Sequence, residues 1–125
     1  MKILVVDDEA EVRGLIQVAL TRLGHSATVA ANGAEALALL GSPDSAIEAI
    51  FTDLRMPGMG GSELIQKLQA ASLHIPVVLI TGQVNVDAAD AKRLGARHIL
   101  HKPFRLADLV EVLNALAQKS PPNGS

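Results

Sequence analysis

Residues whose side chains can do chemistry stand at the ends of short apolar segments of this chain. Asp7 and Asp8 follow residues 1–6, Asp53 follows residues 49–52, Thr81 follows residues 77–80, and Lys102 follows residues 98–101. In an open parallel α/β sheet, ligands bind outside the carboxyl ends of the strands, close to the point where the strand order reverses. If each segment is a strand of one such sheet, we expect these side chains to converge on a single pocket.

This set of side chains suits a divalent cation and a phosphoryl group. Three carboxylates at close range repel one another, which raises the pKa of at least one of them, and a hard divalent cation relieves that repulsion. Mg²⁺ typically takes one or two carboxylates and keeps several waters. Lys102 supplies a positive charge for a phosphate dianion, and the hydroxyl of Thr81 can donate to its oxygens. An aspartate can then act as a nucleophile toward phosphorus.

The elements that must position these residues alternate along the chain. The expected strands are residues 1–6, 25–31, 49–52, 77–80 and 98–101. The expected helices are residues 12–23, 32–40, one after the loop 56–61, about 84–94, and 106–116. Their apolar residues recur at helical spacing. Gly24 is a natural stop for the first helix, and Asn32 with Glu35 forms a capping-box-like start for the second.

Strands that alternate with helices imply a parallel sheet covered on both faces. Right-handed crossovers then restrict the topology to a few doubly wound orders. We predict an α/β fold with a single doubly wound, five-stranded parallel sheet in the order 2-1-3-4-5 and five helices. In that order the first and third strands are neighbours, so Asp7, Asp8 and Asp53 would lie side by side, with Thr81 and Lys102 on the next strands along.

Composition narrows the function classes. The chain has 125 residues, of which 49% are hydrophobic, and a net charge of -2 with no cysteine. These values predict one folded domain without disulfides and without the basic face that direct nucleic-acid binding needs. No apolar run approaches the ~20 residues of a membrane span. The N-terminus also lacks a signal-peptide pattern. We therefore expect a soluble, cytoplasmic protein.

The motifs at the strand ends occur in a recognisable order. They are Val5-Val6-Asp7-Asp8-Glu9, Thr52-Asp53-Leu54-Arg55-Met56-Pro57-Gly58-Met59, Leu79-Ile80-Thr81-Gly82, and Gly95-Ala96 followed by His101-Lys102-Pro103-Phe104. With these motifs, residues 1–118 resemble the receiver domain of two-component response regulators, which has a flavodoxin-like fold. Residues 119–125 have the composition of a flexible tail or linker. That composition suits a stand-alone regulator as well as a receiver from a transcription-factor regulator or a hybrid histidine kinase.

The resemblance implies a role for each site residue. Asp53 would be the phosphoacceptor, which receives phosphate from a histidine kinase or a phosphotransfer protein. Asp8 and Asp53 would bind Mg²⁺ directly, with the backbone carbonyl of Arg55 as a third protein ligand and Asp7 acting through water. Lys102 would pair with the phosphate, Thr81 would turn inward to bond it, and the Lys102–Pro103 peptide would be cis. The domain would be a phosphorylation-controlled signalling module and not a conventional enzyme.

The chain also departs from the family pattern. Ile99 stands where the family usually has the switch aromatic. Gly60 stands where the family often has Asp or Ser. Arg55 and Gln83 occupy two positions that in the family tune the lifetime of the aspartyl phosphate. By the resemblance, a homodimer or an output domain would use the face of the fourth helix, fifth strand and fifth helix.

The sequence also leaves other functions to consider. A phosphorylation-silent scaffold with the same fold, acting by protein–protein interaction, is the main alternative because of Ile99. A Mg²⁺-dependent phosphatase would carry a second acid two residues after its nucleophile, and that position is Arg55. A flavin-binding protein would need a phosphate-cradling first loop, whereas Asp7, Asp8 and Glu9 would repel the phosphate.

Overall fold

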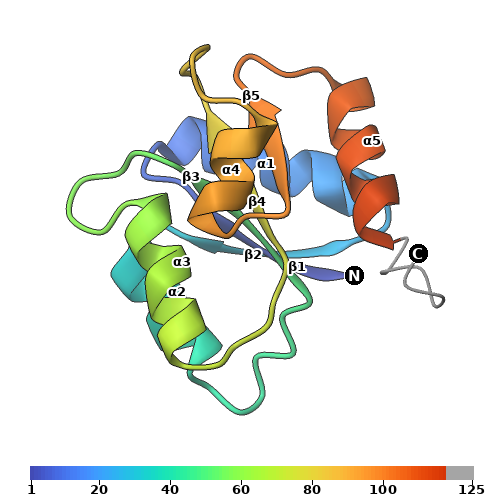
Figure 1. Cartoon of the computed structure of the whole chain (residues 1–125). Helices are drawn as coiled ribbons and strands as arrows, with labels where there is room; N and C mark the ends of the chain where they lie inside the picture. Colours follow the sequence, from blue (N-terminus) through green and yellow to red (C-terminus); the bar gives the residue numbers. More distant parts are fainter. Residues whose placement is uncertain (118–125) are drawn as a thin grey trace, which may run out of the picture.

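A parallel β-sheet organises residues 1–117, which the computed structural model describes (Figure 1). The strands are β1 (Lys2–Val6), β2 (Ser26–Ala30), β3 (Ala49–Asp53), β4 (Val77–Thr81) and β5 (His98–His101). The helices are α1 (Ala10–Arg22), α2 (Gly33–Leu40), α3 (Gly61–Ala70), α4 (Ala88–Leu94) and α5 (Leu106–Ala117). The predicted tail, residues 119–125, lies outside the described residues.

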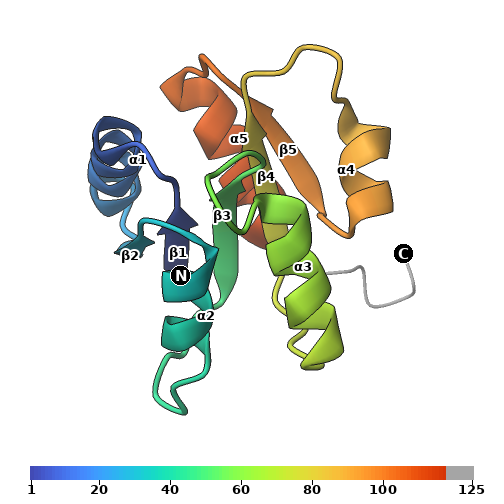
Figure 2. The same cartoon turned by 90° about the vertical axis from the view of Figure 1, so that its left-hand side faces the viewer.

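The strand order is β2-β1-β3-β4-β5, and every pairing is parallel, which confirms the predicted topology. Helices α1 and α5 cover one face of the sheet, and α2, α3 and α4 cover the other (Figures 1 and 2). Each face has its own apolar core because successive strand residues point to opposite sides. In β3, for example, Phe51 packs in the α1–α5 core and Ile50 in the core beneath α2, α3 and α4.

Local sequence signals define several helix ends. Gly24 follows α1 with a φ of 91°, a conformation that costs glycine little. The side chain of Asn32 accepts the backbone N–H of Glu35 at 2.8 Å, so Asn32 caps α2 as predicted. The Glu35 carboxylate accepts the N–H of Ala31 at 2.9 Å, one residue before the position expected in a capping box.

The fourth helix is shorter than predicted. It begins at Ala88, whereas the sequence pattern placed its start near Val84, which is 93% exposed. Asp87 accepts the N–H of Asp90 while the Asp90 carboxylate accepts the N–H of Asp87, so this reciprocal cap sets the start. Residues 82–87 therefore form a loop after β4, and α4 covers only a small part of the sheet.

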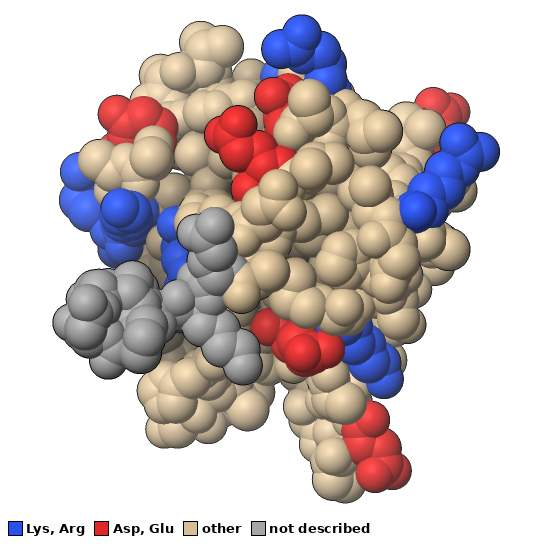
Figure 3. Space-filling view, turned by 90° about the vertical axis from the view of Figure 1, so that its right-hand side faces the viewer, with Lys and Arg blue, Asp and Glu red and all other residues tan. Residues whose placement is uncertain are grey.

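The charged surface and the lengths of the helices are the remaining general features of the fold. On the face shown in Figure 3, basic and acidic side chains form small separate groups. Within residues 1–117, no helix combines the length and the hydropathy needed to cross a bilayer.

The start of α3 lies unusually close to the end of β3. A Cβ on Gly61 would lie 2.6 Å from the carbonyl oxygen of Asp53 and 3.1 Å from the Cα of Leu54, both of which are backbone atoms. Because neither atom can move without distorting β3, this position requires glycine. Gly14, in the middle of α1, has no neighbour within 4 Å of such a Cβ.

We predict that Gly61→Ala lowers the free energy of unfolding by about 1–3 kcal/mol, the range for overpacking a tight site. Gly14→Ala is the matched control, and it should raise the free energy of unfolding by about 0.5–1 kcal/mol because alanine suits a helix interior better. Urea unfolding followed by circular dichroism measures both. Equal effects of the two substitutions would show that the backbone approach at Gly61 is unimportant.

Candidate functional site

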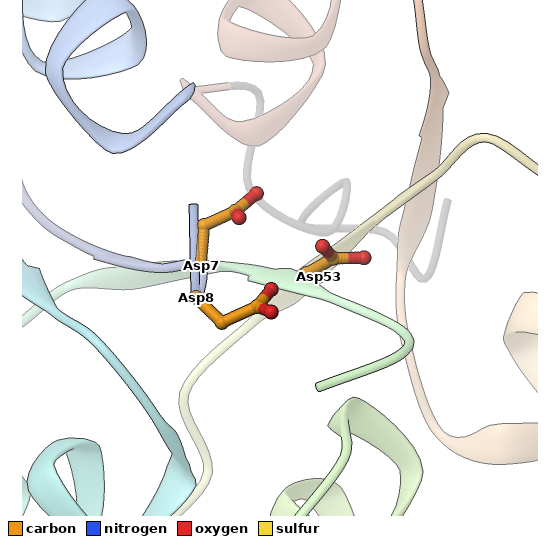
Figure 4. Close-up of side chains that lie close together, drawn as sticks. All are labelled: Asp7, Asp8 and Asp53. Carbon is orange, nitrogen blue, oxygen red and sulfur yellow. The ribbon is translucent and has the colours of Figure 1, made fainter. Parts of the chain in front are cut away.

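The ends of β1 and β3 bring the acidic residues together. Val6 pairs with Thr52, so Asp7 and Asp8 leave the sheet beside Asp53, the last residue of β3 (Figure 4). One carboxylate oxygen from each of Asp7, Asp8 and Asp53 lies within 4.8 Å of the other two. Asp7 and Asp53 are buried and Asp8 is exposed. The three aspartates predicted to meet at this edge therefore do meet.

Lys102 places its ammonium group between the two buried carboxylates. Its Nζ lies 3.2 Å from Asp7 Oδ2 and 3.1 Å from Asp53 Oδ2, and it donates to both. Glu9 Oε1 is 3.6 Å away from the same nitrogen. The Lys102–Pro103 peptide bond that follows is cis, as expected. Lys102 thus closes the site from β5, which is three strands away from β1 in the sheet.

The pKa values of the two central groups follow from this geometry. Burial raises the pKa of Asp53, and the charge of Asp7 raises it further, while the hydrogen bond and charge of Lys102 oppose that rise. Burial by itself would lower the pKa of Lys102, but its hydrogen bonds and charge interactions with Asp53 and Asp7 leave the pKa raised. The site therefore holds Lys102 charged and makes Asp53 readier to take up a proton in the metal-free protein.

Thr81 ends β4 at the same edge of the sheet and is almost fully buried. Its Oγ1 accepts the backbone N–H of Gln83 at 3.0 Å, so the hydroxyl oxygen is engaged with the loop that follows β4. Thr81 pairs with His101, which places it next to the residue that precedes Lys102. The carboxylates, the hydroxyl and the ammonium consequently stand at the ends of four neighbouring strands, β1, β3, β4 and β5.

Arg55 lies in the loop after β3, two residues beyond Asp53. Its backbone N–H donates to Asp53 Oδ1 at 3.3 Å. With the amide oxygen of Gln83 turned toward it, its guanidinium also donates to that oxygen, at 3.2 Å from one terminal nitrogen. Gln83 belongs to the loop after β4, and a second contact holds this loop: His101 Nε2 lies 2.5 Å from the carbonyl oxygen of Val86. Side chains from the β3 loop and from β5 therefore both fix the loop after β4.

Sequence reasoning assigned no role to two residues that hold Asp7. The backbone N–H of Glu9 donates to Asp7 Oδ1 at 2.9 Å, and Arg13 Nη1 donates to the Asp7 carbonyl oxygen at 2.8 Å. Glu9 belongs to the acidic motif, so its proximity was visible in the sequence. Arg13 lies in α1, six residues after Asp7, and no local pattern marks its contact.

An apolar groove adjoins the site between α1 and α5. It has a volume of about 530 Å³, and Lys102 is part of its wall. Its other lining side chains are apolar: Val12, Leu15, Ile16, Ala19, Pro103, Phe104, Leu106 and Leu109. Leu15 is 72% exposed and Leu106 is 58% exposed. Contiguous exposed apolar surfaces commonly mark sites that bind other proteins.

The comparisons with known proteins agree with this fold. Residues 3–114 match the family described as the response regulator receiver domain. The chain belongs to the receiver domains of two-component response regulators, which are signal-transduction domains.

Relatives of two sizes share the domain. The chain is 34% identical over 110 residues to the DNA-binding transcriptional regulator NtrC of Escherichia coli, a match that covers 87% of this chain and 23% of that protein. It is 35% identical over 117 residues to a chemotaxis protein CheY homolog of Campylobacter jejuni, covering 90% of this chain and 89% of that protein. The chain thus spans about a quarter of NtrC and most of the CheY homolog.

Solved structures show the same architecture. The receiver domain of NtrX from Brucella abortus superposes with a TM-score of 0.85 at 33% identity, over 94% of this chain and 99% of that one. The chemotaxis response regulator CheY4 of Vibrio cholerae superposes with a TM-score of 0.82 at 29% identity, over 92% and 97% of the two chains.

We predict that Lys102→Met lowers the free energy of unfolding of the metal-free protein by up to about 3 kcal/mol at pH 7, because it leaves two buried carboxylates without their cation. The loss should be smaller in an Asp53→Asn background, where one of these charges is already absent. Lys92→Met, at an exposed position, is the control and should change stability by less than about 0.5 kcal/mol. Urea unfolding of the four variants in a double-mutant cycle measures the coupling.

The loss of unfolding free energy caused by Lys102→Met should depend on pH. Because the pKa of Asp53 is raised in the folded protein, the folded state takes up this proton at a higher pH than the unfolded chain, whose aspartates titrate near about 4. Protonation of Asp53 then favours folding, so the penalty of Lys102→Met should shrink as the pH falls from 7 through the raised pKa. A penalty that is additive with Asp53→Asn and constant with pH would contradict the charge pairing.

Proposed function

We propose that this receiver domain accepts a phosphoryl group on Asp53, from a histidine kinase or a phosphotransfer protein, in a Mg²⁺-dependent reaction. The observation that carries the proposal is the meeting of Asp7, Asp8 and Asp53 with Lys102 at one end of the sheet. Membership of the receiver family supports it. The cytoplasm, where kinases draw on ATP, is the compartment in which we expect the domain to act.

The donor set fits a hard divalent cation. Three carboxylates lie close together, and the single ammonium of Lys102 leaves them with an excess of negative charge. We assign Asp8 and Asp53 as direct ligands, the backbone carbonyl of Arg55 as a third, and Asp7 as a partner through water. A bound Mg²⁺ would neutralise charge on the transferred phosphoryl group.

The protein's own residues would carry the transfer. A carboxylate oxygen of Asp53 attacks phosphorus, the bond between phosphorus and the donor's imidazole nitrogen breaks, and the electron pair of that bond returns to the imidazole. Lys102, already 3.1 Å from Asp53, pairs with the phosphoryl oxygens. Water later cleaves the acyl phosphate and restores the carboxylate.

The loop after β4 is the element we expect to respond. Thr81 would have to exchange its contact with the Gln83 N–H for one in which its hydroxyl donates to a phosphoryl oxygen. Such an exchange would shift a pre-existing equilibrium of the loop and α4. We place the output, a homodimer or an output domain, on the α4–β5–α5 face, where the partly buried Ile99 replaces an aromatic switch residue.

The apolar groove between α1 and α5 suits the phosphodonor protein. A donor must bring its phosphohistidine to Asp53, and the groove shares Lys102 with the site. Burial of exposed side chains such as Leu15 and Leu106 would supply the docking energy. We therefore assign the groove to the surface of the donor protein that surrounds its phosphohistidine.

Intact mass spectrometry after incubation with acetyl phosphate tests the phosphoacceptor. We expect one base-labile phosphoryl group on the wild type, lost on removal of Mg²⁺ with EDTA and lost in Asp53→Asn. Asp44→Asn, in the exposed turn before β3, is the control and should label like the wild type. Labelling of Asp53→Asn would overturn the assignment. Absence of both labelling by a protein donor and Mg²⁺ binding by calorimetry would favour the phosphorylation-silent scaffold.

Substitution within the groove tests the docking surface. Leu15→Glu should slow transfer from a phosphorylated donor protein by about tenfold or more, because a charge would enter an apolar contact. Its labelling by acetyl phosphate should stay unchanged, since Leu15 lines the groove and is not part of the acidic cluster. Leu39→Glu, on α2 at the opposite face of the sheet, is the matched control. Equal slowing by both variants, or slower acetyl phosphate labelling, would argue against this docking site.

A further inference from the structure

A second hollow lies at the end of the sheet opposite Asp53. It has a volume of about 410 Å³ and is bounded by α3, the start of β4, and the turn from α4 into β5. Its floor is apolar and nearly buried, with Ile65 and Leu68 from α3, Val77 from β4, and Ala96. This size falls within the range of about 300–1,000 Å³ that small-molecule sites occupy.

The chain fixes the shape of this hollow through a close approach of α3 and the α4–β5 turn. Gly95 ends α4 with a φ of 101°, and a Cβ there would lie 2.8 Å from Ile65 and 2.5 Å from the amide nitrogen of Gln69. Arg97 is held next to it, because its backbone N–H donates to the Val77 carbonyl oxygen at 2.8 Å. The walls are thus backbone-supported. The hollow lies where α4 ends at Leu94, between the turn into β5 and α3.

The rim of the hollow is basic. Lys92, Arg97 and His74 line it, with the amide of Gln69, and no aspartate or glutamate of residues 1–117 does. Within residues 1–117, the basic residues that form ion pairs are Arg93 and Lys102. Neither Lys92 nor Arg97 takes part in such a pair.

A neighbouring histidine reports the same positive field. The pKa of His98 is lowered first by burial and then by the positive charges of Arg97 and Lys92. Both cations therefore lie near His98, and they also line a neighbouring hollow together with Glu111. An anion bound on the side away from Glu111 would gain charge-assisted contacts with the two cations, and an apolar group attached to that anion would cover the floor below.

We propose that this hollow is a second binding site, which takes a small organic anion with an apolar body, such as an aromatic carboxylate. The anionic group pairs with Lys92 and Arg97, and the apolar body contacts Ile65, Leu68 and Ala96. The site is separate from the phosphoacceptor edge and does not depend on phosphorylation of Asp53.

Titration of the ¹⁵N-labelled full chain with 2-naphthoate, followed by NMR, tests the proposal. We expect saturable amide shifts concentrated in residues 69–77 and 92–97. The uncharged analogue 2-naphthamide should bind about tenfold more weakly or worse, because it lacks the charge that Lys92 and Arg97 recognise.

Matched variants separate the site from general surface charge. Lys92→Gln combined with Arg97→Gln should weaken 2-naphthoate binding by about tenfold or more. Gln69→Glu should weaken it as well, because it adds a carboxylate to the opposite wall. Arg93→Gln is the control, since Arg93 pairs with Asp90 and does not line the hollow. All four positions are exposed, so the variants should fold like the wild type.

Three results would overturn the proposal. One is the absence of saturable shifts at residues 69–77 and 92–97, including the case in which shifts appear in α1 and α5 instead. Another is equal affinity for 2-naphthoate and 2-naphthamide. The third is an equal effect of Arg93→Gln and of the Lys92 and Arg97 substitutions.

Discussion

The contact of the Lys102 ammonium with Asp7 and Asp53 is the interaction on which the rest of the site depends. Two carboxylates are buried at the end of a sheet whose interior is apolar, and an unpaired buried charge costs several kcal/mol. Lys102 offsets part of that cost from β5. It does not neutralise the cluster, because Asp8 and Glu9 add further negative charge. The remaining excess explains why the same edge suits a divalent cation.

The short fourth helix shapes both ends of the sheet. Because α4 begins only at Ala88, the chain after Thr81 is a loop held by side-chain contacts to Gln83 and Val86. Because α4 ends at Leu94, the turn that follows it borders the hollow beside Arg97. The reciprocal cap of Asp87 and Asp90 thus sets the start of α4 and the length of the loop before it, while Gly95 sets the end of the helix beside the hollow.

Much of the fold was predictable because its signals are local. Apolar segments that stop at polar residues predicted the strands, and Asn32 and Gly24 marked helix ends by capping chemistry that acts within a few residues. The start of α4 was predicted wrongly, because an alanine-rich segment carries a weak periodic pattern and the Asp87 cap outweighed it. The contact of Arg13 with the Asp7 carbonyl oxygen was not predictable, since it depends on how α1 packs against the end of β1.

The sequence by itself determined which residues stand at the strand ends and that the strands alternate with helices, because hydrophobic period and capping act over short distances along the chain. The sequence also predicted the strand order, but only the tertiary structure sets the distances at which the strand ends meet. The placement of β1 beside β3 sets Asp7 next to Asp53, and the reach of Lys102 from β5 depends on the twist and packing of the whole sheet. The groove and the hollow belong to the same category, because a cavity arises from the fit between elements distant in sequence.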